Sequence, residues 1–134
     1  MQLNIYSDGG ARGNPGPAAI GVVVCDESHA VVYEHKDTIG TATNNVAEYL
    51  ALIAAYEIVK TFHPTVLSFH LDSELVVRQM RGEYKVKHDN MKKLFTVVKE
   101  NERLFPTVSY THLPREHEFM RKADKLVNDA LDGR

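Results

Sequence analysis

The sequence has little cysteine, no long apolar run and no excess of basic residues. A single cysteine, Cys25, has no second cysteine to pair with, so we expect a buried core residue in a reducing compartment. No apolar stretch approaches the roughly 18 residues of a membrane span, and the first residues lack the features of a signal peptide. A net charge of −2 argues against a strongly basic, non-specific nucleic-acid binder. These absences favour a cytoplasmic protein.

Strand-like and helix-like patterns alternate along the 134 residues, a length that fits one domain over 1–134. The expected strands are 2–7, 18–27, 30–38, 65–71 and 107–113, and the expected helices are 43–60, 73–80, 89–105 and 122–131. A hairpin-type start followed by crossover connections is typical of an α/β fold with a mixed sheet. The first strand is then central, because its parallel neighbours are reached through helices.

The helix expected over 43–60 has an apolar stripe, and Thr43 suits its N-cap. The stripe consists of Ala47, Leu50, Ala51, Ala54 and Ile58. Glu48 lies beside this stripe, where a charge is hard to explain by packing alone. The alternative is a first-turn acid favoured by the helix dipole.

Four carboxylates lie near the ends of the expected elements. Asp8 and Asp72 each follow an apolar strand, and Asp124 lies at the start of the last helix. Turn or capping chemistry would account for each of these alone. However, ligand sites in such sheets lie outside the carboxyl ends of the parallel strands, so we expect Asp8 and Asp72 to meet there. Carboxylates without His or Cys suit Mg²⁺ or Mn²⁺, and two ions about 4 Å apart could clamp a phosphodiester.

A loop rich in glycine and proline follows Asp8. Gly9, Gly10 and Gly13 permit close approach to a ligand backbone, and the two prolines of "GNPGP" stiffen the return into the next strand. The alternative is a phosphate-cradling P-loop, but the Gly-Lys-Ser/Thr ending of that motif is missing.

Four motifs together resemble type 1 ribonuclease H: "YSDGGARGNPGPAAIG", "TNNVAEYLAL", "LDSELVV" and "ADKLVNDAL". They occur in that family's order and span nearly the whole chain. The resemblance implies a ribonuclease-H-like mixed five-stranded sheet of order 3-2-1-4-5 flanked by helices. It also implies an endonuclease that cuts the RNA strand of RNA–DNA hybrids with two Mg²⁺ ions, leaving 5′-phosphate and 3′-hydroxyl ends. The sequence does not determine the oligomeric state, and we expect a monomer. The catalytic and metal-binding carboxylates would be Asp8, Glu48, Asp72 and Asp124.

The resemblance also implies substrate contacts from the glycine loop and from the start of the first long helix. Gly9, Gly10, Asn14, Thr43, Asn44 and Asn45 are the residues concerned. A hybrid-selective enzyme needs short polar groups that can read 2′-hydroxyls in the minor groove. Turn formation by Asn14 and helix capping by Thr43 and Asn44 are alternative roles that can coexist with these contacts.

Two departures from the family concern binding. Glu74 stands where relatives commonly carry Gln at a minor-groove contact, and it either touches the substrate or faces solvent. The basic helix and loop of many bacterial members are absent from 81–94. Lys85, Lys87, Lys92 and Lys93 offer a modest substitute, unless they form only a solvated face. Because phosphate contacts supply salt-dependent affinity, we predict weak, salt-sensitive binding.

The segment before the last helix, "HLPREHEFMRKAD", holds three candidates for a residue that aids proton transfer or product release. Arg115 matches the family's "PRE" and is preferred, His117 comes second, and His112 is expected to be structural at a strand end. For the fourth carboxylate, Asp124 is preferred to Asp129, which lies further along the same helix.

Other functions remain open at this point. A binding module for hybrids or double-stranded RNA could keep the fold without catalysis, although no carboxylate has been lost. Double-stranded RNA as an additional substrate is undecided. A phosphatase with Asp8 as nucleophile would want an Asp two residues later, where Gly10 stands.

Overall fold

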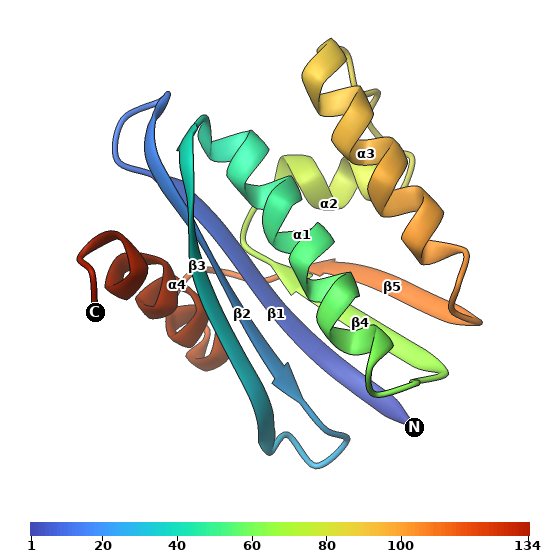
Figure 1. Cartoon of the computed structure of the whole chain (residues 1–134). Coiled ribbons are helices and arrows are strands. Elements are labelled where there is room, and N and C mark those ends of the chain that lie inside the picture. The colour runs from blue at the N-terminus through green and yellow to red at the C-terminus, as the bar shows by residue number, and fades with distance from the viewer.

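The computed structural model describes residues 1–134, which form one five-stranded sheet and four helices (Figure 1). The strands are β1 (Gln2–Ala11), β2 (Gly16–Cys25), β3 (Val31–Ala42), β4 (Val66–Leu71) and β5 (Thr107–His112). The helices are α1 (Asn44–Lys60), α2 (Glu74–Met80), α3 (Asp89–Glu102) and α4 (Glu118–Leu131). None of the helices has the length and apolarity needed to cross a membrane.

The sheet order is β3-β2-β1-β4-β5, as the sequence predicts. β1 is central, antiparallel to β2 and parallel to β4, and β5 extends the parallel half. The pairing of β1 with β4 stops at Tyr6–His70, although β1 continues to Ala11. The second half of β1 therefore has a free edge next to the end of β4, and this is where Asp8 lies.

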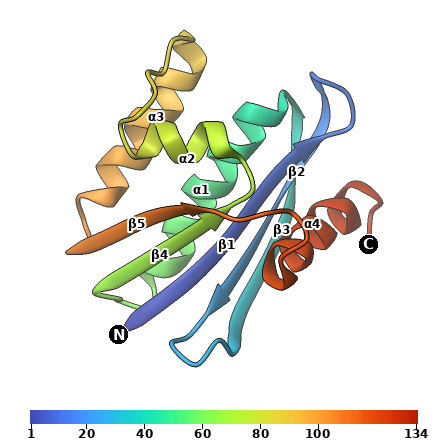
Figure 2. The same ribbon diagram turned by 180° about the vertical axis from the view of Figure 1, so that it is seen from behind.

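The two faces of the sheet are covered unequally. Figure 2 shows α4 alone on one face, while α1, α2 and α3 lie on the other. Side chains alternate between the faces of a strand. Leu3 and Ile5 of β1 therefore join a core of 18 buried residues with α1, whereas Tyr6 joins a core of five with Met120 and Ala123 of α4. Asp8, two residues after Tyr6, belongs to the α4 face.

Two expectations about helices were wrong in detail. In α1, Leu50, Ala54 and Ile58 are only partly buried, and the fully buried positions include Leu52 and Ala55. The expected stripe was misplaced because this helix is apolar on several sides and packs against both the sheet and α3. α4 begins at Glu118 rather than 122, so Asp124 lies in its second turn.

Candidate active site

Three carboxylates meet at the carboxyl ends of β1 and β4. Asp8, Glu48 and Asp72 each place an oxygen within 4.8 Å of the others. Asp8 and Glu48 are 6% and 5% exposed, which is rare for acids without a cationic partner. Asp124 lines the same cleft from α4. The structure thus brings all four predicted carboxylates to one place.

Glu48 accepts a backbone hydrogen bond at the free edge of β1, where no neighbouring strand is present to accept it. Its Oε1 accepts a hydrogen bond from the backbone N–H of Gly9 at 2.8 Å, and Asn44 Oδ1 accepts one from Ala11 N–H at 2.9 Å. Residues four apart on a helix share a face, and residues two apart on a strand share an edge, so the pairs match. The first turns of α1 therefore complete the hydrogen bonding of β1.

Gly9 allows α1 to come this close. A Cβ atom at this position would overlap the backbone carbonyl of Ala47, so any side chain would push the helix and Glu48 away from β1. Gly10 differs, because its added Cβ would lie 3.5 Å from the side chain of Val127, an ordinary contact.

A close approach between β2 and α4 brings Asp124 into the cleft. Gly21 pairs with Asp8 across β1 and β2, and a Cβ at Gly21 would overlap the backbone oxygen of Ala123 in α4. The adjacent residue of α4 is Asp124. Asp129 instead pairs with Lys125 at 2.7 Å and does not line the cleft, which supports the preference for Asp124. Sequence reasoning missed Gly21, whose only signal is a glycine in the middle of an apolar strand.

The carboxylates are poised to hold a cation. Burial, followed by the charge of Asp72, raises the pKa of Asp8 to about 7. Burial and then the charge of Asp8 raise the pKa of Glu48 well above its usual range. Glu48 Oε2 is buried without any hydrogen-bond partner. An orphaned oxygen among crowded hard oxygen donors fits Mg²⁺ or Mn²⁺, which would relieve both the repulsion and the missing contact.

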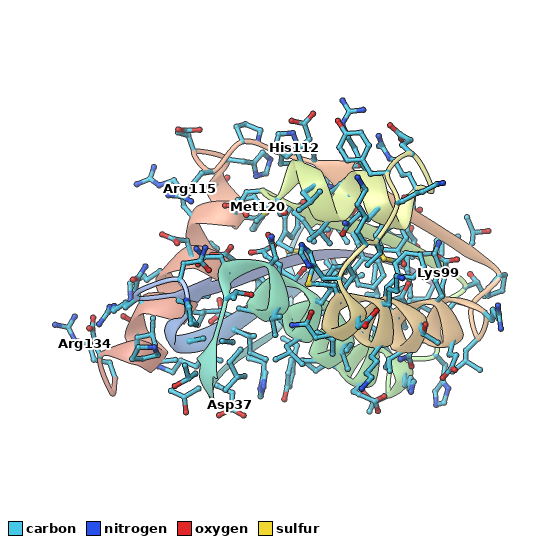
Figure 3. The ribbon with its side chains drawn as sticks, turned by 90° about the horizontal axis from the view of Figure 1, so that it is seen from above. Asp37, Lys99, His112, Arg115, Met120 and Arg134 are labelled. Atoms are coloured by element: carbon cyan, nitrogen blue, oxygen red, sulfur yellow. The ribbon has the colours of Figure 1, made fainter.

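Arg115 is the nearest cation to these acids. Its Nε lies 3.5 Å from Asp72 Oδ2, its side chain is exposed, and the charge of Asp72 raises its pKa further. Figure 3 shows Arg115 on the segment that leads into α4, with His112 further back at the end of β5. His112 does not line the cleft.

His117 has a structural position. Its Nδ1 accepts a hydrogen bond from Phe119 N–H at 3.2 Å as the N-cap of α4, and its ring stacks on Tyr6 at 5.8 Å. It does not line the cleft either. The segment between β5 and α4 is shorter than the sequence patterns predicted, because α4 begins directly after His117.

The asparagines of the two motifs join the glycine loop to the start of α1, and Asn44 Oδ1 accepts its hydrogen bond from Ala11 N–H. Asn14 Oδ1 accepts a hydrogen bond from Asn44 N–H at 3.0 Å, and Thr43 caps α1 through Val46 N–H. With their oxygens occupied, Asn14 and Asn44 keep their amide N–H donors free at the surface. Capping is thus present for Thr43, whereas the side chain of Asn44 binds β1 rather than capping the helix.

A second groove lies next to the cleft on the side of α2, and we call it the 84–88 groove. Its lining includes Asn45, Tyr84, Lys85, Lys87 and His88. Asn45 lines both hollows, so they are adjacent there. Sequence reasoning identified the two lysines but missed Tyr84.

The remaining candidates lie outside both hollows. Glu74 pairs with Arg78 at 2.9 Å on the exposed side of α2, and Lys92 lies 3.9 Å from Asp89. Neither they nor Lys93 line the cleft or the 84–88 groove. The extra acid at position 74 is thus neutralised by its own helix.

Comparison with known proteins agrees with this fold and cleft. A family model described as reverse transcriptase-like matches residues 6–130. The bifunctional protein Rv2228c of Mycobacterium tuberculosis is 44% identical over 133 residues, covering 98% of this chain and 36% of that protein. This chain therefore spans about a third of the length of that relative.

Two crystal structures superpose along almost their whole length. RNase H1 from the archaeon Halobacterium salinarum gives a TM-score of 0.94 at 39% identity, with 100% of both chains covered. LC11-RNase H1 in complex with an RNA/DNA hybrid gives 0.92 at 44% identity, covering 98% of this chain and 97% of that one. Sheet order and carboxylate cleft define a ribonuclease-H-like protein. The chain belongs to the type 1 ribonuclease H family.

Proposed function

We propose that this protein is an endonuclease that hydrolyses the RNA strand of RNA–DNA hybrids at the cleft of Asp8, Glu48, Asp72 and Asp124. The observation that carries the proposal is the buried carboxylate cluster with its orphaned Glu48 oxygen. Such a cluster is costly without a cation, so its role lies in what it binds. The relative crystallised with an RNA/DNA hybrid supports the choice of substrate.

The four carboxylates would hold two Mg²⁺ ions, with Mn²⁺ as a substitute. When bound, these ions supply an activated water and charge neutralisation at the leaving oxygen, and products with 5′-phosphate and 3′-hydroxyl ends follow. Asp8 is central, because Glu48, Asp72 and Asp124 all act on its carboxyl group. Asp124 reaches the cleft from the other helix and would contribute to one ion only.

Arg115 would contact the phosphate rather than move a proton. A guanidinium whose pKa is raised further by Asp72 stays charged, so it cannot act as an acid or base near neutral pH. The exposed Arg115 side chain is held only by Asp72, and with that carboxylate engaged as a metal ligand Arg115 would be free to reach a phosphate oxygen. We assign Arg115 to substrate positioning or product release.

The free amides of Asn14 and Asn44 would donate hydrogen bonds to the minor groove, where 2′-hydroxyls distinguish RNA from DNA. The 84–88 groove would receive the DNA strand, since it begins at Asn45 and carries Lys85 and Lys87. Two exposed lysines neutralise few phosphates, so binding should remain weak and salt-sensitive. Gly9 and Gly10 line the cleft where backbone could approach the RNA strand.

A cleavage assay tests the proposal directly. An end-labelled RNA–DNA hybrid is incubated with magnesium, manganese or chelator, beside double-stranded RNA, single-stranded RNA and duplex DNA, with Asp72→Asn as control. We expect metal-dependent cleavage of the hybrid's RNA strand that Asp72→Asn abolishes. Binding without cleavage under every condition would instead support the alternative, a non-catalytic module, and the double-stranded RNA lane defines the breadth of the substrate.

A further inference from the structure

Arg12 lies at the opposite end of the cleft from Arg115. It belongs to the turn between β1 and β2, and its Nη1 lies 2.6 Å from Asp132 Oδ1, just beyond the end of α4. Its Nη2 donates a second hydrogen bond, at 3.3 Å, to Asn128 Oδ1. Figure 3 shows this end of α4, near the labelled Arg134, well separated from Arg115 before its start. The two arginines therefore flank the helix that carries Asp124.

The cleft is strongly acidic apart from these two side chains. Its charged lining consists of Asp8, Glu48, Asp72, Asp124, Arg12 and Arg115. A polyanion entering this cleft meets cations only at its two ends. Arg115 is held by an acid of the site itself, whereas Arg12 is held by Asp132, which does not line the cleft.

We propose that Arg12 binds a backbone phosphate of the RNA strand away from the cleavage site, and that Asp132 occupies Arg12 in its place when no substrate is bound. This inference rests on the proposed function. The DNA strand is assigned to the 84–88 groove on the α2 side, so the end of the cleft at Arg12 continues the path of the cut strand.

The geometry suits a phosphate a few nucleotides from the carboxylates. Asp124 and Asp132 are eight residues apart on α4, which corresponds to about 12 Å along a helix. At about 3.4 Å of axial rise per nucleotide, this distance equals three to four phosphates of one strand. The planar fork of an arginine binds a phosphate as readily as a carboxylate.

The present ion pair can be exchanged at little cost. The Arg12 and Asp132 side chains are 47% and 38% exposed, and exposed pairs contribute little net stability. With an internal competitor, the apparent dissociation constant equals the intrinsic constant divided by the fraction of protein in which the cation is free. With the usual strength of such a pair, release of Arg12 should improve binding by roughly two- to fivefold.

Opposite responses of two variants test the proposal. Dissociation constants for an RNA–DNA hybrid are measured by fluorescence anisotropy between 50 and 300 mM salt, in the Asp72→Asn background to prevent cleavage. We expect Arg12→Ala to weaken binding several-fold and to reduce the slope of log K against log salt by about 0.9, one phosphate contact. Asp132→Asn should tighten binding roughly two- to fivefold.

Two controls separate this role from others. Asp37→Asn makes the same charge change on β3, at a residue that does not line the cleft and that Figure 3 shows well apart from Arg115. It should leave the dissociation constant almost unchanged. In the double variant Arg12→Ala/Asp132→Asn the gain from Asp132→Asn should vanish, because no cation remains to be released.

The outcomes also distinguish this inference from the proposed function. If Arg12 only clasps the β1–β2 turn to α4, both single variants weaken binding, and the inference is overturned. Asp132→Asn could have no effect on binding although the Asp72→Asn protein binds the hybrid and the wild-type protein cuts it. In that case the inference fails and the proposed function stands. A wild-type protein that neither binds nor cuts the hybrid overturns both.

Discussion

Glu48 and Asp124 reach one cleft from opposite faces of the sheet, and they are held there very differently. Glu48 is carried by α1, which packs into the core of 18 residues, and its Oε1 binds the backbone of Gly9. Asp124 is carried by α4, which packs into the core of five. Its carboxylate is partly exposed and accepts no hydrogen bond from the protein.

The difference shows that three carboxylates are positioned by the central packing of the fold, whereas the fourth, Asp124, is positioned by the docking of a single helix. Asp8, Glu48 and Asp72 are crowded together because β1 packs directly against both β4 and α1. Asp124 depends on how α4 sits against Gly21. Changes on the α1 side should therefore damage the site more than equivalent changes on the α4 side.

The largest contrast is expected between Glu48→Gln and Asp124→Asn. Both remove one charge, and glutamine can still accept the Gly9 hydrogen bond. Losing a ligand shared by the central cluster should lower the cleavage rate about a thousandfold or more, equivalent to about 4 kcal/mol. Asp124→Asn should lose about tenfold. Single-turnover cleavage across a magnesium titration measures both, and equal losses would contradict the comparison.

Three glycines allow the same contrast to be tested through packing. Gly9→Ala should destabilise the protein by about 3 kcal/mol, because neither the sheet nor the backbone of α1 can yield at Ala47. Gly21→Ala should cost about 1–2 kcal/mol, since α4 can shift outward, with reduced metal affinity. Gly10→Ala is the matched control and should change little. Chemical denaturation gives the stabilities, and a Gly9→Ala loss no greater than the control's would contradict this account of α1 packing.

The sheet order and the carboxylate cluster could be anticipated because both follow from local patterns. Asp8 and Asp72 end apolar runs, and the ends of parallel strands share one sheet edge. The resemblance of four motifs then gave the strand order, which the structure confirms. The backbone contacts that bring the four carboxylates together are harder to predict from the sequence.

The close approaches of backbones escaped prediction because they depend on which elements pack together, and so did capping by His117, whereas capping by Thr43 was predicted correctly. Gly21 appears in the sequence only as an interruption of an apolar strand, although it sets the docking of α4. His117 was the second candidate for proton transfer because of its spacing from Asp124 in the sequence, but its side chain caps α4. Glu74 was a candidate substrate contact, yet its ion pair with Arg78 emerges only once α2 is formed.

The pH dependence of stability provides a third, smaller test. Burial and the charge of Asp72 raise the pKa of Asp8 from about 3.8 to about 7 in the folded state. Between these values the folded protein keeps a proton that the unfolded chain has released. The free energy of unfolding of metal-free protein should therefore fall as pH rises from about 4 to about 7, by about 1 kcal/mol per pH unit.

Asp8→Asn should remove the part of this fall that Asp8 contributes and leave the part due to Glu48, whose pKa is also raised by burial. It should also raise the melting temperature at pH 7 in the absence of metal. Magnesium should stabilise the wild-type protein at pH 7 and leave the variant unchanged, because binding to the native state alone shifts the unfolding equilibrium. Thermal unfolding at several pH values, with and without magnesium, measures both effects. If the stability of the wild-type protein and of Asp8→Asn depended on pH in the same way, Asp8 would not have a raised pKa in the folded state.

The smallest effect is expected at His117, on the lightly packed side. Replacing an N-cap costs about 1 kcal/mol, so His117→Ala should loosen the first turn of α4 and raise the magnesium concentration needed for half-maximal cleavage a few-fold. His117→Asn restores the cap without the ring and should recover most of this loss. Because a positioning residue does not touch the reacting atoms, kcat at saturating magnesium should stay near the wild-type value in both variants. A loss of about a hundredfold in kcat at saturating metal, not rescued by Asn and accompanied by a missing limb of the pH–rate profile, would instead assign His117 to proton transfer. The Nδ1 contact with Phe119 favours the first result, since that nitrogen is already committed to the helix that positions Asp124.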